Sequence, residues 1–274
     1  MKTCLVGCGG IAAVHGSVLT SGIDTEFVAA ADIKPEKAQT YAENFHTKPY
    51  PSLESMLDAE KPDVLHICTP HYLHVPMTIY ALERNINVFM EKPPAISFDQ
   101  LEELKKAAAK SEAQLGFCYQ NRYNASIRAA KDLIDSGKAG KVLGARAFVT
   151  WCRGAAYYIE SGWRGSLKTE GGGVLINQSV HTQDLLCFLL GDPTTVDATM
   201  TNHHLKNVIE VEDTLEAYID WGTGHTACIS DFYQSLRDNR RFSLNLETME
   251  PSIRLMLGTY ESARSGHSVT LIEQ

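Results

Sequence analysis

Lysine and histidine side chains follow two apolar runs of this sequence, at points where catalysis could occur. Lys92 follows the run Val88–Met90 and precedes two prolines, and His71 follows the run Val64–Thr69. Both runs are typical of strands, and in an open α/β sheet the carboxyl ends of the strands face the ligand crevice. The residues that we expect to contact a nucleotide there are Thr69, Pro70, His71, His74, Glu91 and Lys92.

Two of these residues have structural alternatives. Lys92 could form a surface salt bridge with Glu91, but neighbours in a strand point to opposite faces, which favours a functional lysine. His74 could equally be a buried histidine whose ring nitrogens are satisfied by the protein. The sequence leaves both roles of His74 open.

The segment GCGGIA near the N-terminus has the spacing of a turn that binds a dinucleotide. Gly7 permits a tight strand-to-helix turn, Gly9 lets the backbone approach a pyrophosphate, and Ala12 allows close packing of helix on sheet. The start of the following helix offers unpaired N–H groups to the phosphates. We therefore expect cofactor contacts from Gly7, Gly9, Gly10, Ile11 and Ala12.

Asp32 lies 25 residues after Gly7, at the end of the second predicted strand. A carboxylate there can accept hydrogen bonds from both hydroxyls of the adenosine ribose. It also repels a 2′-phosphate, which favours NAD over NADP, although nearby Lys34 weakens that preference. The alternative role for Asp32 is to cap the helix predicted at 34–44.

A second cluster of candidates lies in the segment GGGVLINQSVH. Gly171–Gly173 precede a helix predicted from Leu175 to Leu190. Asn177 and His181 are four residues apart and so fall on one face of that helix. They are candidates for contacting a substrate.

The elements that position these residues follow two patterns. The first 120 residues alternate strand-like and helix-like stretches, which predicts a doubly wound parallel sheet in a Rossmann domain at 1–120. Strands then follow one another without helices, which predicts an α+β domain at 121–274 with an open mixed or antiparallel sheet. The strands expected are 3–6, 26–31, 64–69, 87–90 and 114–118, then 142–151, 196–203 and 211–221, with helices at 126–136 and around 226–238 and 249–265.

Composition narrows the class of protein. The 274 residues carry 25 Lys+Arg against 33 Asp+Glu, a net charge of -8, so nucleic acid and anionic membrane are poor partners. No apolar run approaches the ~20 residues of a membrane span, and no signal peptide is seen, so we expect a cytoplasmic protein. The seven cysteines form no C-x-x-C pair, which favours reduced thiols and no metal site.

The ordered set GCGGIA, Asp32, CTPHYLH, EKPPA and GGGVLINQSVHTQDLLCFLLG resembles the glucose-fructose oxidoreductase and inositol dehydrogenase family, Gfo/Idh/MocA, over nearly the whole chain. The resemblance implies an NAD(P)-dependent oxidoreductase that acts on the secondary alcohol of a sugar, sugar derivative or cyclitol. It also implies a Rossmann domain and a C-terminal domain whose open sheet often mediates oligomers, so we expect a homodimer or homotetramer.

The same resemblance implies catalytic roles. The lysine of the EKP motif, here Lys92, is a catalytic or substrate-orienting group, and burial would let it exchange protons nearer neutral pH. His181 matches the family's base, but Asn177 replaces a frequent aspartate. An amide can orient the imidazole or bind a substrate hydroxyl, yet it cannot stabilise imidazolium as a carboxylate does. More of the proton transfer therefore falls on Lys92, and Asp184 is either an additional carboxylate near His181 or a surface residue.

Substrate contacts are expected from two further segments that the resemblance points to. Aromatic rings suit the apolar faces of a sugar, and arginine suits hydroxyl, carboxylate or phosphate groups. Trp163 and Tyr157 could instead only pack the domain interface. The predicted substrate contacts are Lys92, Tyr119, Arg122, Tyr157, Trp163, Arg164, Asn177 and His181, with Tyr158 in the same loop and Gln120 assigned to the cofactor.

One stretch departs from the family. Members usually continue the sheet through several strands after Tyr218–Trp221, whereas here only Gly222–Gly224 precede His225. The C-terminal sheet is therefore expected to be short, or residues are missing from the sequence. An NAD-binding regulatory protein with this fold and no turnover is the alternative function. A methyltransferase would also use a glycine-rich turn, but it does not explain Lys92 or His181.

Overall fold

The computed structural model describes residues 1–221, 232–243 and 245–271 of the chain. It contains two compact units, which are described separately: residues 1–192 with 196–218, and residues 193–195 with 219–274. Every residue of the predicted site belongs to the first unit.

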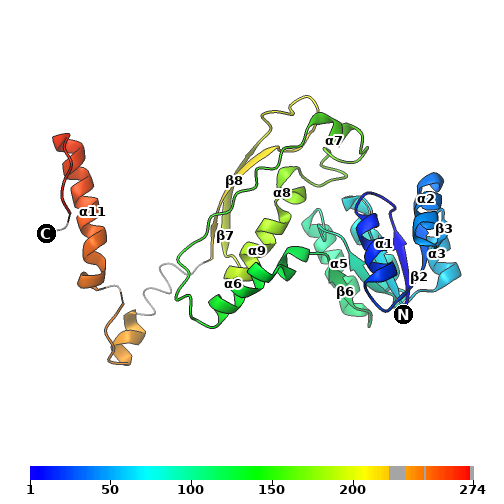
Figure 1. Cartoon of the computed structure of the whole chain (residues 1–274), viewed down its shortest axis with the longest axis horizontal. Coiled ribbons are helices and arrows are strands. Elements are labelled where there is room, and N and C mark those ends of the chain that lie inside the picture. The colour runs from blue at the N-terminus through cyan, green and yellow to red at the C-terminus, as the bar shows by residue number, and fades with distance from the viewer. Residues whose placement is uncertain (222–231, 244, 272–274) are drawn as a thin grey trace. The chain divides into compact units, whose positions relative to one another are not determined.

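The first unit begins with a six-stranded parallel sheet in the order β3-β2-β1-β4-β5-β6 (Figure 1). This confirms the predicted doubly wound sheet. The edge strand β3 was not predicted, because its three residues include a proline, which is tolerated in a sheet mainly at an edge. The strands are β1 (Lys2–Val6), β2 (Glu26–Ala31), β3 (Lys48–Tyr50), β4 (Val64–Ile67), β5 (Asn87–Met90) and β6 (Leu115–Phe117).

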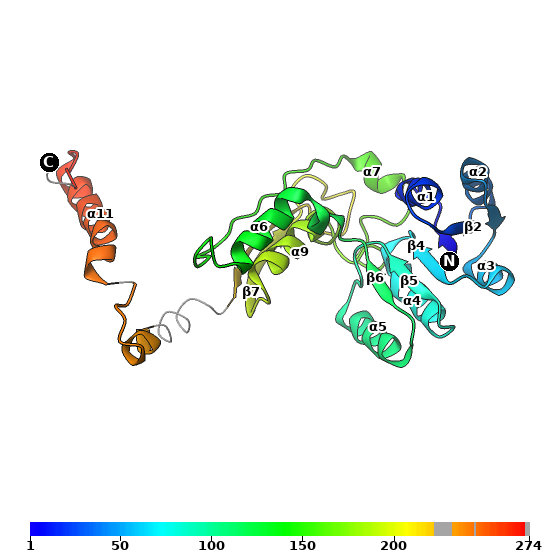
Figure 2. The same ribbon diagram turned by 60° about the horizontal axis from the view of Figure 1, so that its bottom comes forward.

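Helices cover both faces of this sheet, with α1 and α2 on one face and α3, α4 and α5 on the other (Figure 2). Serine caps begin two of them, since Ser52 Oγ accepts from Ser55 N and Ser97 Oγ accepts from Gln100 N. The helices are α1 (Ala12–Ser21), α2 (Pro35–Phe45), α3 (Leu53–Glu60), α4 (His74–Leu82) and α5 (Phe98–Lys110), with a short 3₁₀ turn at His71–Leu73.

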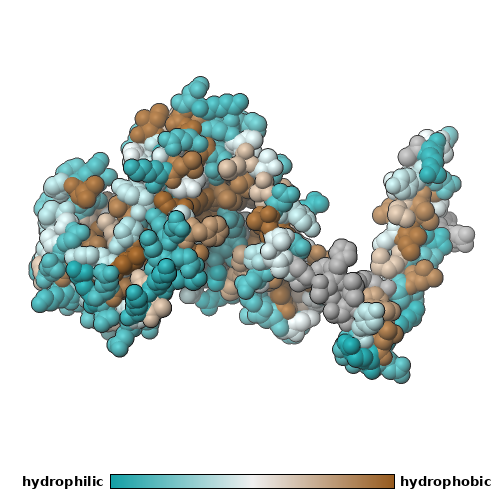
Figure 3. Space-filling view, turned by 180° about the vertical axis from the view of Figure 1, so that it is seen from behind, coloured by the Kyte–Doolittle hydropathy of each residue, from teal (hydrophilic) through white to brown (hydrophobic). Residues whose placement is uncertain are grey.

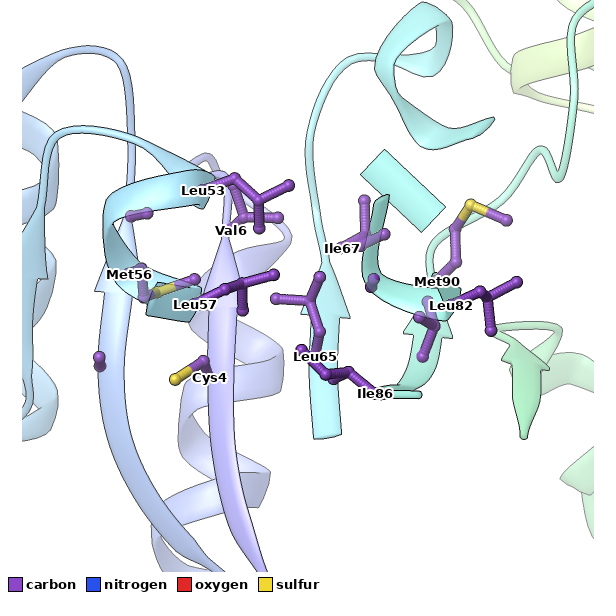
Figure 4. Packing of buried hydrophobic residues seen from close by; sticks show 14 of the residues in the cluster. Cys4, Val6, Leu53, Met56, Leu57, Leu65, Ile67, Leu82, Ile86 and Met90 are labelled. Atoms are coloured by element: carbon purple, nitrogen blue, oxygen red, sulfur yellow. The ribbon is translucent and has the colours of Figure 1, made fainter. Parts of the chain in front are cut away.

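An apolar core fills the space between the sheet and its helices. Strand side chains alternate between the two faces, so Cys4 and Val6 pack with α3 while Leu5 packs toward α1 and α2. Figure 4 shows the larger cluster, in which Leu65 and Ile67 meet side chains from α3 and from the segment around α4. This core holds the strand ends that carry the predicted site.

The chain after residue 120 forms helices and a small antiparallel sheet of β7 (Thr195–Thr201) and β8 (Thr214–Asp220). This confirms a C-terminal α+β region with a short sheet. The predicted interruption at Gly222–Gly224 lies outside the described residues. The remaining elements are a 3₁₀ turn at Gln120–Tyr123, α6 (Ala125–Asp135), α7 (Ala155–Ile159), α8 (Val174–Asn177) and α9 (Val180–Leu190).

Two predictions for this region were wrong. Residues 142–151 were expected to form a half-buried strand, but they belong to no strand and are mostly exposed. Their apolar alternation needs a neighbouring strand to pair with, and neither described strand of this region pairs with them. The single helix expected at 175–190 is broken into α8 and α9 at Gln178 and Ser179, where Ser179 N donates to Val174 O rather than to Leu175 O.

The second unit contains α11 (Leu246–Ser265), which confirms the helix expected near 249–265. Asn245 caps its start by accepting from Glu247 N and Thr248 N. Its surface exposes apolar side chains, among them Leu246 and Leu257 (Figure 3). Residues 226–231 of the helix predicted around 226–238 lie outside the described chain. None of the described helices is both long enough and apolar enough to cross a membrane.

Candidate active site

The glycine turn after β1 runs close to the backbone of the neighbouring segment at Gly7 and is open at Gly9 and Gly10. Gly7 has φ +91°, and a Cβ there would lie 2.7 Å from the backbone of Cys68 in the neighbouring segment, so only glycine fits. A Cβ on Gly9 or Gly10 would have no atom within 4 Å. The backbone is therefore open next to the start of α1, which fits a dinucleotide lying against the turn.

Asp32 lies beside this turn. Its Oδ2 accepts from Cys8 N at 2.9 Å and its Oδ1 accepts from Lys34 N at 2.8 Å. The first residue of α2 is Pro35, and no side chain caps that helix, so the capping alternative is not observed. Each carboxylate oxygen retains acceptor capacity, which fits a contact with ribose hydroxyls.

The residues at the end of β4 differ in what they can offer a ligand. The Thr69 hydroxyl is buried and has no hydrogen-bond partner within the described chain, as expected of a group that a ligand would satisfy. His71 is buried against Trp163, and burial lowers its pKa to about 3. His74 is fully buried with Nδ1 2.8 Å from Pro93 O and Nε2 2.9 Å from Thr69 O, which favours the structural role for this histidine.

Glu91 and Lys92 point in different directions, as expected for neighbours at a strand end. Glu91 Oε1 lies 3.0 Å from His15 Nε2, whereas Lys92 Nζ contacts Asn177 and forms no ion pair with Glu91. Glu91, His15 and Cys118 bring three potential metal ligands within 4.8 Å of one another. Burial, followed by the charge of Glu91, raises the pKa of the Cys118 thiol to about 12, which disfavours the thiolate that a metal would need.

Lys92 is anchored by Asn177. Its Nζ donates to the backbone oxygen of Asn177 at 2.9 Å and to Oδ1 at 3.0 Å. An ammonium group has three N–H donors, so one remains for a substrate oxygen. Burial lowers the pKa of Lys92, and the nearby Arg164 and Arg153 act in the same direction, which makes proton exchange easier.

The other side of Asn177 meets a carboxylate that the sequence analysis did not single out. Asn177 Nδ2 donates to Glu170 Oε1 at 2.5 Å and to Tyr157 Oη at 3.2 Å. Glu170 has no exposed surface. The hydrogen bonds of the Asn177 side chain therefore go to Lys92, Tyr157 and Glu170 rather than to His181, so the idea that Asn177 orients the imidazole finds no contact.

His181 lies at the start of α9 with 9% of its surface exposed. Its Nε2 lies 3.4 Å from Gln120 Nε2, and its buried Nδ1 has no hydrogen-bond partner among the described residues. Burial, followed by the charge of Lys92, lowers its pKa, so the imidazole is neutral at neutral pH. A neutral imidazole can accept a proton at the nitrogen that carries no hydrogen, which is Nε2 here because Gln120 Nε2 can only donate to it.

Arg122 and Asp184 pair with each other. Arg122 Nε donates to Asp184 Oδ2 at 2.8 Å and Nη2 donates to Oδ1, in a two-pronged contact. Asp184 is therefore engaged with Arg122, which makes Arg122 less available to a substrate, while the charge of Asp184 still opposes the lowering of the His181 pKa by burial. Tyr119 remains beside the site, with its ring 5.9 Å from that of His181.

Aromatic and cationic side chains from the loop before the glycines gather at Tyr157. The Arg164 guanidinium lies over the rings of Tyr157 and Trp163, at 4.3 and 4.6 Å, and its buried Nε has no partner in the described chain. Arg153, which the sequence analysis missed, lies 5.3 Å from the Tyr157 ring. Tyr158 instead packs with Ile209 and Val211.

Close packing requires two of the three glycines before α8. A Cβ on Gly173 would lie 1.9 Å from Glu212 O, and one on Gly171 would lie 2.5 Å from Ile96. Glu212, also missed from the sequence, accepts from Gly173 N and Leu175 N at the start of α8. These contacts place Asn177 against Lys92.

A cavity of about 550 Å³ adjoins this cluster. Pro93, Tyr119, Leu175, Ile176 and Met200 contribute to its mainly apolar lining. Lys92, Asn177 and His181 are not among the lining residues, so the cavity lies next to the candidate catalytic groups and does not contain them.

Two family models match this chain. Residues 1–119 match the oxidoreductase family with an NAD-binding Rossmann fold, GFO/IDH/MocA, and residues 127–247 match the GFO/IDH/MocA C-terminal domain. Together they contain every predicted site residue except Gln120 and Arg122, which lie in the short turn between them.

Two of the curated relatives that this chain matches at low identity are dehydrogenases. The chain is 28% identical over 225 residues to D-glucoside 3-dehydrogenase of Escherichia coli, covering 81% of this chain and 62% of the relative. It is 26% identical over 198 residues to inositol 2-dehydrogenase of Rhizobium meliloti, covering 71% and 57%. The chain thus spans less than two thirds of the length of either relative.

Solved structures show the same fold. The WlbA dehydrogenase of Chromobacterium violaceum, in complex with NADH and UDP-GlcNAcA, has a TM-score of 0.78 and 33% identity, covering 82% of this chain and 64% of that one. The Bordetella pertussis WlbA complex with the same ligands has a TM-score of 0.74 and 31% identity, covering 80% and 67%.

Proposed function

This chain belongs to the Gfo/Idh/MocA oxidoreductase family, and we propose that it is an NAD-dependent dehydrogenase acting on a secondary alcohol of a sugar, sugar derivative or cyclitol. The observation that carries the proposal is Lys92, held at the carboxyl end of β5 by Asn177 with one N–H donor left for a ligand. The open glycine turn and Asp32 support the cofactor, and the Asp32 carboxylate favours NAD over NADP.

Bound NAD would supply the hydride acceptor, and the residues of the chain would manage the hydroxyl proton. The free N–H of Lys92 hydrogen-bonds the reacting oxygen, and its lowered pKa allows proton exchange with that oxygen. Neutral His181 would accept the proton at Nε2, because the amide nitrogen of Gln120 beside it can only donate and so leaves the ring hydrogen on Nδ1. Tyr157 and Trp163 provide aromatic surface for the ring of the substrate.

We also propose that the substrate carries a negatively charged group. Arg153 and Arg164 lie around the Tyr157 ring in a chain whose net charge is -8, so the local charge opposes the overall charge. Both WlbA structures were solved with UDP-GlcNAcA, which supports an acidic sugar nucleotide as one such substrate. Arg122 is less suited to this role because Asp184 already binds it.

A turnover screen tests the proposal. The purified protein is given NAD with neutral sugars, inositols, sugar phosphates, uronates and sugar nucleotides, and the absorbance of NADH is followed. We expect turnover in the acidic group of compounds. Binding of NAD by calorimetry with no turnover of any compound would instead favour a regulatory protein that uses this fold only to bind the nucleotide. A homo-oligomer, proposed from the family resemblance, is tested by light scattering on the same sample.

A further inference from the structure

Glu170 is a fully buried carboxylate on the far side of Asn177 from Lys92. Its Oε1 accepts from Asn177 Nδ2 and its Oε2 accepts from Gly165 N, both at 2.5 Å. Its backbone oxygen lies 2.9 Å from His71 Nδ1, which ties it to the end of β4. These contacts hold the carboxylate in one place.

The groups on the two sides of Asn177 determine how its side-chain amide is oriented. An ammonium group can only donate, so the oxygen Oδ1 faces Lys92. Burial raises the pKa of Glu170, but the hydrogen bonds from Gly165 N and Asn177 Nδ2 favour its ionised form, which can only accept, so Nδ2 faces Glu170. The second N–H of Nδ2 reaches Tyr157 Oη at 3.2 Å. Both N–H groups and the oxygen of the amide are therefore used.

An aspartate at position 177, which the family often carries, would not fit beside Glu170. Two buried carboxylates would face each other across the present 2.5 Å contact, and one of them would have to bind a proton. Asn177 and Glu170 are therefore a matched pair. The negative charge that an aspartate at position 177 would carry next to Lys92 is carried instead by Glu170, on the other side of Asn177.

We propose that Glu170 is a positioning residue for Lys92. Its carboxylate holds the Asn177 amide with the oxygen toward Nζ, so that negative charge acts on the lysine through an intervening amide instead of from an adjacent aspartate. This role rests on the proposed function, in which Lys92 handles the hydroxyl proton of the substrate.

The charges around Asn177 and Glu170 determine whether the pKa of Lys92 should rise or fall in a variant. The negative charge of Glu170 raises the pKa of Lys92, against the larger lowering by burial. Removing that charge should lower the pKa of Lys92 further. The other titratable or charged groups that contact or act electrostatically on Lys92, Asn177 or Glu170 are Glu91, Arg153, Arg164, His71, His181, Tyr157, Tyr158 and Glu212.

Three variants test the matched pair: Glu170→Gln, Asn177→Asp and the double variant. The Glu170→Gln variant should lose activity because its NH₂ group would face either Gly165 N or Asn177 Nδ2, and two donors cannot form a hydrogen bond. The Asn177→Asp variant should lose activity because it puts a second carboxylate in contact with Glu170. In the double variant the introduced glutamine can accept from Gly165 N and donate to the introduced aspartate, whose other oxygen accepts from Lys92.

We expect kcat, measured with a substrate found in the turnover screen, to fall about 10- to 100-fold in each single variant, because Lys92 is displaced. We expect the double variant to be about tenfold or more faster than the slower single variant, a coupling that independent sites do not show. A double variant whose losses simply add would overturn the proposal. If Glu170→Gln does not fold, the comparison of Asn177→Asp with the double variant decides.

A second readout does not depend on turnover. Competitive acetylation of Lys92 with acetic anhydride, followed by mass spectrometry across pH, reports the pKa of its amine. We expect that pKa to fall in Glu170→Gln and to be unchanged in Glu160→Gln, an exposed carboxylate just after α7. An unchanged Lys92 pKa in Glu170→Gln would refute the role of Glu170. Absence of turnover in the unmodified protein would refute the proposed function while leaving this measurement decisive for Glu170.

Discussion

The two halves of the candidate site are held by different forces. Before residue 120, strand side chains such as Leu65 and Met90 have no exposed surface and pack in an apolar core on each face of the sheet. After it, the buried apolar residues of the described chain are Tyr158, Ile209 and Val211, and the groups that hold the site are buried and polar. The buried polar residues of that second half include Glu170, Asn177, Gln178, His181 and Glu212.

The apolar core of the first half therefore mainly stabilises the fold, and the buried polar groups of the second half mainly position the reacting side chains. The hydrophobic effect does not depend on the orientation of the buried groups. The Rossmann half can therefore hold the glycine turn and the strand ends in place without positioning individual polar side chains. A buried polar network works only when every donor and acceptor is matched, so the second half places side chains accurately but responds strongly to single changes. Substitutions in the first half should mainly change the free energy of unfolding, and substitutions at the junction should mainly change turnover.

The largest effect is expected at the junction of the halves. Lys92→Met should lower kcat about 10²- to 10⁴-fold, the range for loss of a general acid or base, while NAD affinity changes little. Steady-state kinetics and calorimetry with NAD check the two quantities. Lys105→Met, at an exposed lysine paired with Glu102, is the control and should retain full activity. Full activity in Lys92→Met would remove Lys92 from the mechanism.

The next effect contrasts the two sheets. Leu65→Ala, in the buried centre of β4, should lower the free energy of unfolding by about 2–5 kcal/mol. Met200→Ala, on β7 with 67% of the residue exposed, should change it by less than about 0.5 kcal/mol. Urea unfolding of both variants measures the difference. An equal loss of unfolding free energy in both variants would mean that Met200 is buried in solution, which a homo-oligomer interface on β7 would explain.

A smaller effect is expected on the cofactor alone. Asp32→Ala removes the carboxylate beside the glycine turn and should weaken NAD binding about 10-fold or more, since a hydrogen bond to a charged group contributes about 1.5–3 kcal/mol. Affinity for NADP should fall less, because the repulsion of the 2′-phosphate is lost too. Calorimetry with both nucleotides tests this, with the exposed Glu36→Ala as control. An equal loss for both nucleotides would argue against a ribose contact.

The smallest effect concerns pH. Burial lowers the pKa of His181 below its ordinary value of 6.5, so more than half of the imidazole stays neutral at pH 6.5. If His181 is the base, kcat/KM for alcohol oxidation should fall less than about twofold between pH 8 and 6.5 and about tenfold per pH unit well below the pKa. A pH profile of kcat/KM measures this. A tenfold loss already at pH 6.5 would be inconsistent with a buried, neutral His181 as the base.

The sequence by itself determined the Rossmann half. Its strands and helices alternate over short distances, and apolar periodicity and turn residues are local signals, so five of the six strands were predicted at nearly their observed positions. The position of Lys92 followed from the same signals, because a charged residue after a buried strand lies at the carboxyl edge of a parallel sheet. The family resemblance placed His181 and Asn177 near it.

Tertiary structure alone decided what these residues contact. Asn177 and Lys92 are 85 residues apart, and Asp184 and Arg122 are 62 apart, so no local pattern indicates either contact. The same holds for the break between α8 and α9 and for the unpaired run at 142–151, which depend on neighbours distant in the chain. Hydrogen-bond partners are chosen by the packing of whole elements, and a buried carboxylate such as Glu170 can be recognised only once that packing brings it against its amide.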